Sequence, residues 1–123
     1  MGRDFTYIDD LVEAVVRLGS CVPRTGDPVA QDGVVDSLSP VGPSRVVNIA
    51  GGMPVGLMDF IGEIEKTLAR SARKNMLPMQ PGDVRETFAD HHLLEALTGY
   101  RPSTPVEVGV REFVEWYVDR YGR

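Results

Sequence analysis

The sequence contains one cysteine, Cys21, among 123 residues, so no disulfide can form within the chain. No histidine or second cysteine stands near this thiol in the sequence, which argues against a catalytic role. Cysteine usage of this kind fits a reducing compartment, and we expect a cytoplasmic protein. No apolar run approaches the ~20 residues of a membrane span and no signal peptide precedes the first predicted strand, so we expect no membrane partner.

Positive charge is also scarce. Only two of the thirteen cationic residues are lysines, Lys66 and Lys74, and the net charge is −5. Nucleic-acid binding needs clustered cations that neutralise phosphates, so nucleic acid is not an expected partner. A hydrophobic content of 42% with 25% charged residues is ordinary for a globular protein, and the length predicts one domain spanning residues 1–123.

Common catalytic patterns are missing too. No GxGxxG or GxxGxxG turn occurs, and Gly51-Gly52 lacks the spacing that receives a pyrophosphate. No tyrosine is followed by a lysine four residues later, which excludes a tyrosine–lysine proton-transfer pair within the chain. Neither a serine nor the cysteine has a nucleophile motif. We therefore predict no catalytic and no cofactor-binding residue in this chain.

The adjacent histidines His91 and His92 invite a metal-site interpretation. Neighbouring residues on a helix point about 100° apart, so they cannot readily chelate one ion from one face. We predict no metal site.

The periodicity that is present predicts an α/β fold of three or four short strands with about four helices. The expected strands are residues 5–8, 45–49, 74–77 and 87–89. The expected helices are residues 11–18, 57 to about 71, 91–97, and a last helix opened by Thr104-Pro105. Asp9 or Asp10 is expected to cap the first helix and Asp90 the third, which Gly99 would end.

Residues 19–44 lack any periodicity. The segment carries four prolines and several glycines and predicts a long irregular insert. Two interpretations stay open, plain disorder and a lid over a substrate.

Two polar groups are not explained by packing. Arg3 stands at the start of the first predicted strand, and a guanidinium there offers forked donors that suit a phosphate or diphosphate. Asp83 follows Pro81-Gly82 in a turn, where its carboxylate could accept two hydrogen bonds from a sugar diol. The alternatives are a surface ion pair of Arg3 with Asp4 or Asp9, and capping of the turn's own amides by Asp83.

The amino-acid sequences of several segments resemble those of a known family. RDFTYIDD at residues 3–10, Val47-Asn48-Ile49, MQPGDV at residues 79–84, LTGYRP at residues 97–102 and the closing helix are similar to the C-terminal part of extended short-chain dehydrogenases that act on nucleotide sugars. Within that family the segments look closest to the UDP-glucuronate 4-epimerase branch. The resemblance covers the whole chain but only the C-terminal part of the family protein.

The resemblance implies a small substrate domain whose Rossmann half is absent from this sequence. It implies that NAD and a catalytic tyrosine belong to that N-terminal Rossmann domain, a partner of this one, and that UDP-sugar binds between the two. Arg3 matches the arginine that contacts the diphosphate, and Asp83 matches the aspartate that contacts the uridine ribose. Gln80 stands where many relatives have an arginine of the diphosphate clamp. Arg85 replaces a common proline and could add a cation near the diphosphate or simply lie in solvent.

The resulting hypothesis is the UDP-sugar-binding part of an NAD-dependent isomerase that interconverts UDP-glucuronate and UDP-galacturonate at C4, inactive without its cofactor half. The alternatives are a domain of another nucleotide-sugar epimerase or dehydratase, and a non-catalytic binding module. Apolar faces that would rest against the cofactor half should be exposed, which predicts self-association into a homo-oligomer.

Overall fold

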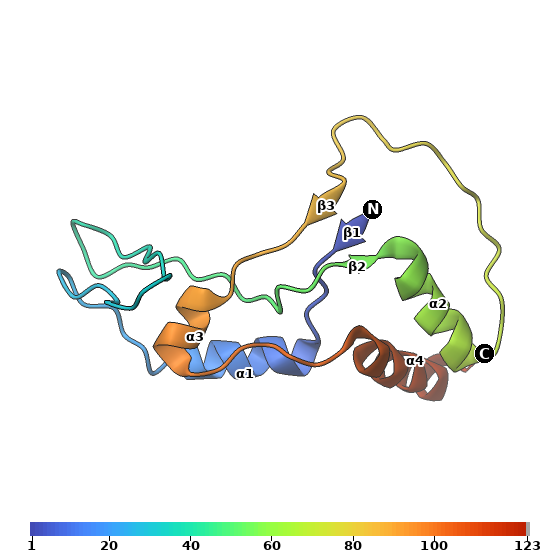
Figure 1. Ribbon diagram of the computed structural model, residues 1–123. Coiled ribbons are helices and arrows are strands. Elements are labelled where there is room, and N and C mark those ends of the chain that lie inside the picture. Colours follow the sequence, from blue (N-terminus) through green and yellow to red (C-terminus); the bar gives the residue numbers. More distant parts are fainter. Residues whose placement is uncertain (123) are drawn as a thin grey trace.

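The computed structural model describes residues 1–122, and within them the fold is α/β, as predicted (Figure 1). The elements follow in the order β1 (Gly2–Arg3), α1 (Ile8–Leu18), β2 (Val55–Gly56), α2 (Leu57–Leu68), β3 (Glu86–Thr87), α3 (His92–Thr98) and α4 (Val106–Tyr121). No helix in this part of the chain combines the length and apolarity needed to cross a bilayer.

The three strands form one mixed sheet in the order β2-β1-β3. β1 runs antiparallel to β2, with Arg3 opposite Val55, and parallel to β3, with Arg3 opposite Thr87. The predicted strands at residues 5–8, 45–49 and 74–77 are wrong, and the one at 87–89 begins at Glu86 and ends at Thr87. A two-residue strand shows no alternation, because it is defined by pairing with residues far along the chain.

The helices agree better with their predictions. α2 begins at Leu57 as expected and ends at Leu68, and Gly99 ends α3 in the left-handed conformation with φ of 70°. α1 begins at Ile8 rather than at residue 11, so Asp9 and Asp10 lie in its first turn and the N-cap is Tyr7. Capping by either aspartate was therefore a wrong prediction.

At the start of α3 the N-cap is His91, while the carboxylate of the preceding Asp90 accepts the amide hydrogen of His92 at 2.7 Å. α4 begins at Val106 with Pro105 as N-cap, one residue later than expected.

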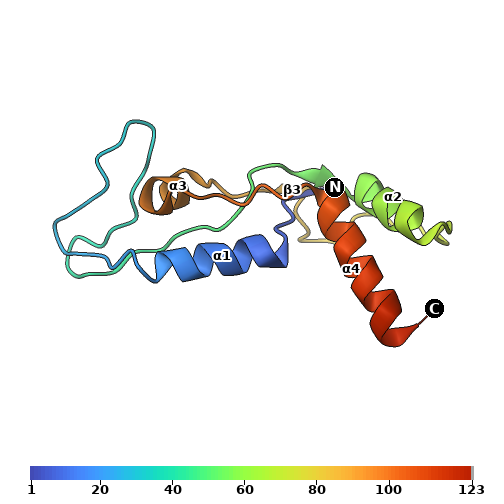
Figure 2. The ribbon, with the colours of Figure 1, turned by 90° about the horizontal axis from the view of Figure 1, so that it is seen from below.

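The helices pack in two pairs that lie on either side of the sheet, α2 against α4 and α1 against α3 (Figures 1 and 2). The rings of Phe5 and Phe60 stack at 4.1 Å and join the chain after β1 to α2. Among residues 1–122 few hydrophobic residues are buried: Ala14, Ala50, Leu94, Val110 and Val114.

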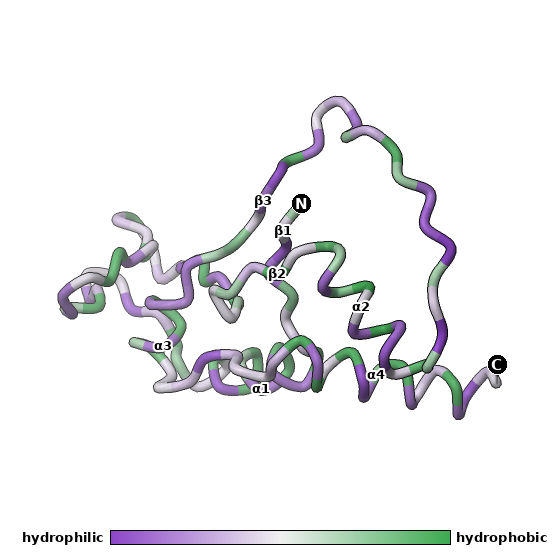
Figure 3. Tube along the Cα trace, turned by 45° about the vertical axis from the view of Figure 1, so that its right-hand side comes forward, coloured by the Kyte–Doolittle hydropathy of each residue, from purple (hydrophilic) through white to green (hydrophobic). Residues whose placement is uncertain are grey.

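The chain is open rather than compact. Its accessible surface is 9010 Å², against about 6,500 Å² for a compact monomer of 13.5 kDa. Hydrophobic residues recur along α1 and α4 (Figure 3), and Val12, Val16, Phe113 and Trp116 are each more than half exposed. The chain between α2 and β3 forms a wide arc in Figure 1. Much apolar surface is therefore left uncovered.

Residues 19–44 contain turns but neither helix nor strand. Asp36 ties parts of this insert together, because its carboxylate accepts backbone amide hydrogens from Val29 at 2.7 Å and from Leu38 at 3.0 Å.

Candidate functional site

Arg3 and Asp83 meet although 80 residues separate them in the sequence. The guanidinium Nη2 donates to Asp83 Oδ1 at 2.9 Å, and Nη1 donates to the carbonyl of Val84 at 2.8 Å and to that of Gly2 at 3.0 Å. About a third of each charged side chain stays exposed, 29% for Arg3 and 34% for Asp83. The ion pair is thus accessible from solvent on one side.

A tight turn presents the carboxylate of Asp83. The amide of Asp83 donates to the carbonyl of Gln80 at 3.1 Å, which closes the turn Gln80-Pro81-Gly82-Asp83. Proline at the second position and glycine with φ of 86° at the third are what a type II turn requires. The amide of Val84 then donates to Asp83 Oδ1 at 2.9 Å, so the carboxylate also caps its own turn.

Arg3 is brought to this turn by the β1–β3 pairing. The amide of Gly2 donates to the carbonyl of Arg85 at 2.9 Å, and the amide of Asp4 donates to that of Thr87 at 3.1 Å. These bonds on either side of Arg3 fix the register of β1 along β3. The Arg3 side chain therefore extends from a backbone position beside the segment that follows the turn.

The other two predicted site residues flank the pair by sequence. The carbonyl of Gln80 belongs to the turn, and the carbonyl of Arg85 belongs to the ladder with Gly2. Both residues are exposed, and within residues 1–122 their side chains make no hydrogen bond or ion pair. Their side chains are available to a ligand that approaches Arg3 and Asp83.

Asp4 is a further residue that sequence reasoning missed except as an alternative partner of Arg3. Its Oδ2 accepts the amide hydrogen of Gly52 at 3.0 Å and that of Ala89 at 3.5 Å, so it links β1 to the chain before β2 and to the chain after β3. Its Oδ1 is buried and has no hydrogen-bond partner in the part of the chain that the structure describes. No local pattern marks this residue, because both of its donors are distant in the sequence.

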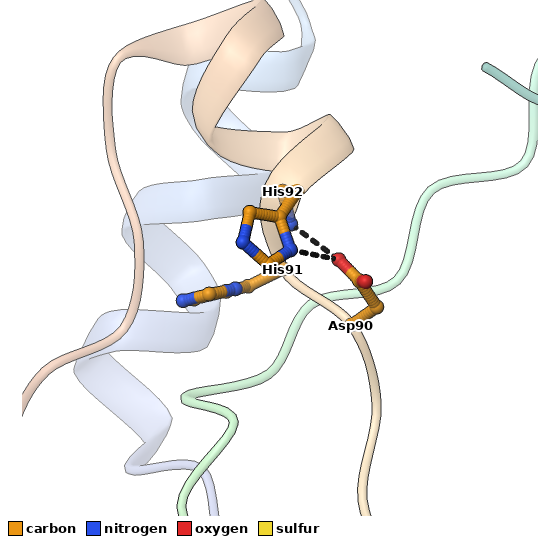
Figure 4. Close-up of side chains that lie close together, drawn as sticks. All are labelled: Asp90, His91 and His92. Atoms are coloured by element: carbon orange, nitrogen blue, oxygen red, sulfur yellow. Dashed lines mark hydrogen bonds and ion pairs between the residues drawn. The ribbon is translucent and has the colours of Figure 1, made fainter. Parts of the chain in front are cut away.

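A second polar cluster lies at the start of α3, where potential ligand atoms of Asp90, His91 and His92 fall within 4.8 Å of one another (Figure 4). His91 precedes the helix, so the geometric premise of two neighbouring helical histidines does not apply here. Asp90 Oδ1 is engaged by both the amide and the ring Nδ1 of His92, each at 2.7 Å. The hydrogen bond from the His92 amide, followed by the one with the His92 ring, holds the pKa of the Asp90 carboxyl below its ordinary value.

The guanidinium of Arg101 occupies the other end of this cluster, where Nη1 donates to His91 Nε2. A guanidinium in hydrogen-bond contact with a ligand atom repels a metal cation at that atom. The cluster is therefore better described as a hydrogen-bonded network that connects the start of α3 with the chain leading to α4.

A surface hollow of about 760 Å³ lies between the end of α2 and α4 and is bordered by Leu68, Phe113 and Tyr117 but not by Arg3 or Asp83. The side chains of Arg3 and Asp83 are partly exposed, and their chemistry marks them as the candidate site.

The chain is similar to known proteins over nearly its whole length. No family model matches. The chain is 56% identical over 123 residues to a protein of Rhizobium meliloti named probable UDP-glucuronate 4-epimerase, and it spans 36% of that protein's length. It is 33% identical to UDP-glucuronate 4-epimerase 4 of Arabidopsis thaliana, covering 98% of this chain and 26% of the plant protein. The chain thus spans about a third of these curated relatives or less.

Solved structures give a consistent result. The crystal structure of UDP-glucuronic acid 4-epimerase from Bacillus cereus in complex with UDP-glucuronic acid and NAD matches 96% of this chain and 32% of its own, with a TM-score of 0.71 and 27% sequence identity. UDP-glucose 4-epimerase from Bifidobacterium longum matches with a TM-score of 0.73 at 18% identity, which supports the fold alone.

Proposed function

We propose that this chain, which belongs to the NAD-dependent nucleotide-sugar epimerase family that includes these relatives, forms the part of such an enzyme that binds UDP-sugar. The observation that carries the proposal is the convergence of Arg3 and Asp83 across 80 residues of sequence. Arg3 supplies guanidinium donors for the diphosphate, and Asp83 supplies carboxylate acceptors for the ribose hydroxyls. Gln80 and Arg85 are proposed to contact the same ligand from the turn and from the start of β3.

The proposed substrates are UDP-glucuronate and UDP-galacturonate, which differ in configuration at C4. This specificity rests on the names of the relatives, since the Rhizobium meliloti protein is named probable UDP-glucuronate 4-epimerase and the Arabidopsis thaliana protein UDP-glucuronate 4-epimerase 4. A different sugar on the same nucleotide is the alternative, and it would use the same contacts of Arg3 and Asp83.

Residues 1–122 offer no glycine-rich cradle for NAD. The glycine pair Gly51-Gly52 is the nearest approach to a dinucleotide fingerprint, but the amide of Gly52 is already taken by Asp4 Oδ2. We therefore place NAD, which supplies the hydride acceptor and donor for inversion at C4 when bound, in an N-terminal Rossmann domain. The role that we propose for this chain is to bind and orient the nucleotide. Its proposed location is the cytoplasm.

The exposed apolar surface supports a docking partner of that kind. The accessible surface exceeds that of a compact monomer of this mass by about 2,500 Å². The outer face of α1 carries Ile8, Val12, Val15 and Val16, which are 52–65% exposed. We propose that this face, the α1 apolar face, rests against the Rossmann domain and that it mediates self-association when this domain is absent.

Binding of UDP to the chain tests the nucleotide site. Calorimetry or NMR titration of the chain with UDP should show binding. Arg3→Met should lower the affinity for UDP about tenfold or more, because it removes a charge-assisted contact. Arg111→Met, which removes an exposed guanidinium on α4, serves as the matched control and should bind UDP as the parent does. Equal affinity of the parent and Arg3→Met for UDP would remove the proposed site.

Substrate specificity is tested separately on an enzyme that joins this chain to a Rossmann domain of the family. Turnover of UDP-glucuronate with release of UDP-galacturonate is the expected result. Turnover of UDP-glucose alone would replace the acidic sugar with the neutral one while leaving the nucleotide site in place.

A further inference from the structure

We propose that Asp83 positions the guanidinium of Arg3 for the pyrophosphate, a role distinct from contact with the ribose. This inference rests on the proposed function, because it concerns the same UDP site. It predicts that removal of the Asp83 carboxylate weakens recognition of the diphosphate and not only of the nucleoside.

Three protein acceptors hold the guanidinium in one orientation. Both hydrogens of Nη1 are taken by the carbonyls of Gly2 and Val84, and one hydrogen of Nη2 is taken by Asp83 Oδ1. An arginine has five N–H donors, so Nε–H and the second hydrogen of Nη2 have no acceptor among residues 1–122. These two donors are the ones that remain for phosphate oxygens.

Asp83 is the only charged member of this set of three acceptors, and it is itself fixed. Its Oδ1 accepts from the amide of Val84, and its backbone is held by the turn bond to Gln80. A carboxylate that cannot rotate freely restricts the guanidinium that it binds. Arginine loses much rotamer freedom when it is ordered, and an arginine ordered before the ligand arrives avoids that loss on binding.

An opposite effect of the same carboxylate makes the test decisive. A negative charge 2.9 Å from the guanidinium partly neutralises it and repels a diphosphate. If neutralisation were the larger effect, removing Asp83 would tighten the binding of the diphosphate. If orientation is the larger effect, as we infer, removing Asp83 weakens it.

The experiment compares two probes, UDP and uridine, which differ only in the diphosphate. Dissociation constants of both are measured by NMR titration for the parent chain, Asp83→Ala, Asp83→Asn and Arg3→Met, with Asp32→Ala as a control that removes an exposed carboxylate of the insert. In parallel, the order of the Arg3 Nε–H bond is measured by ¹⁵N relaxation without ligand, which reports orientation directly.

We expect Asp83→Ala to lower the preference for UDP over uridine by about three- to tenfold, the size expected when one long side chain must be ordered on binding. Asp83→Asn keeps an oxygen acceptor and should lose less. The Arg3 Nε–H bond should become more mobile in Asp83→Ala, and Asp32→Ala should match the parent in all measurements.

Two results would overturn the inference while leaving the UDP site intact. One is an equal loss of UDP and uridine affinity in Asp83→Ala, which would make Asp83 a ribose contact alone. The other is an unchanged or increased preference for UDP over uridine in Asp83→Ala, whatever the order of the Nε–H bond. By contrast, Arg3→Met with the UDP affinity of the parent would overturn the proposed function itself. If binding of both probes is too weak to measure, the Nε–H order of Asp83→Ala against the parent decides the inference.

Discussion

The guanidinium of Arg45 binds the carboxylate of Asp36 through two parallel hydrogen bonds, Nε to Oδ1 and Nη2 to Oδ2, each 2.8 Å long. Both side chains are almost fully buried, with 8% and 7% of their surfaces exposed. Arg45 directly follows the insert, so the pair ties the C-terminal end of the insert to Asp36. The Asp36 carboxylate also accepts hydrogen bonds from the amides of Val29 and Leu38. One carboxylate thus organises a segment that has neither helix nor strand.

Removing that carboxylate should open the insert. In Asp36→Ala the buried Arg45 loses its counter-charge, a change that is strongly destabilising where the charge cannot reach water. We expect trypsin to cleave after Arg24, within the insert, about tenfold faster or more than in the parent, since cleavage follows the population of the open form. Asp32→Ala provides the control, and cleavage at the parent rate in Asp36→Ala would contradict the role of Asp36.

Acid should loosen the same segment. The hydrogen bonds from Arg45, opposed by burial, place the pKa of Asp36 well below its ordinary value of 3.8. Because the unfolded form binds the proton more readily, the stabilisation is complete above about pH 4 and is lost as the pH falls through the folded pKa. Protection of the insert's backbone amides against hydrogen exchange should therefore decline below pH 4. In Asp36→Asn this decline should be flatter, and an identical pH profile in both proteins would contradict the assignment.

The insert and the strands show where sequence reasoning succeeded and failed. α2 and the end of α3 were predicted because their signals are local: an apolar stripe from Leu57 onward and a glycine at position 99. β1 was missed because its two residues pair with Val55 and Thr87, which no local window contains.

The candidate site divides in the same way. The Pro-Gly of the turn that presents Asp83 is readable from the sequence, since proline and glycine define the turn type. Its contact with Arg3 is not readable from local patterns, because it depends on the register of β1 along β3. The resemblance to the epimerase family identified both residues, but it did not reveal that they bind each other.

Asp10 gives a further prediction, because it stabilises a different element from the one expected. Instead of capping α1, its carboxylate accepts from the amides of Ser103 and Thr104 at 3.2 and 2.9 Å and from the hydroxyl of Tyr100 at 3.0 Å. Burial opposes its ionisation, yet the hydrogen bonds, led by those from Thr104, lower the pKa of Asp10.

Replacing Asp10 should destabilise the whole fold. Asp10→Ala leaves several partly buried donors without an acceptor, a loss of about 1–3 kcal/mol in the free energy of unfolding by urea. Asp9→Ala changes the neighbouring exposed carboxylate and should cost less. Equal losses in the two variants would show that the link from α1 to the chain before α4 contributes nothing.

The α1 apolar face gives the last prediction. Its four exposed aliphatic side chains leave a stripe for which water is an unfavourable neighbour, so we expect the isolated chain to self-associate through this face. Val16→Lys places a charge in the stripe and should weaken the association about tenfold or more, as measured by light scattering across a dilution series. Val41→Lys, at a 90% exposed position of the insert, is the matched control and should associate as the parent does. A parent chain that stays monomeric at high concentration would exclude self-association, and equal weakening by both substitutions would assign it to net charge rather than to α1.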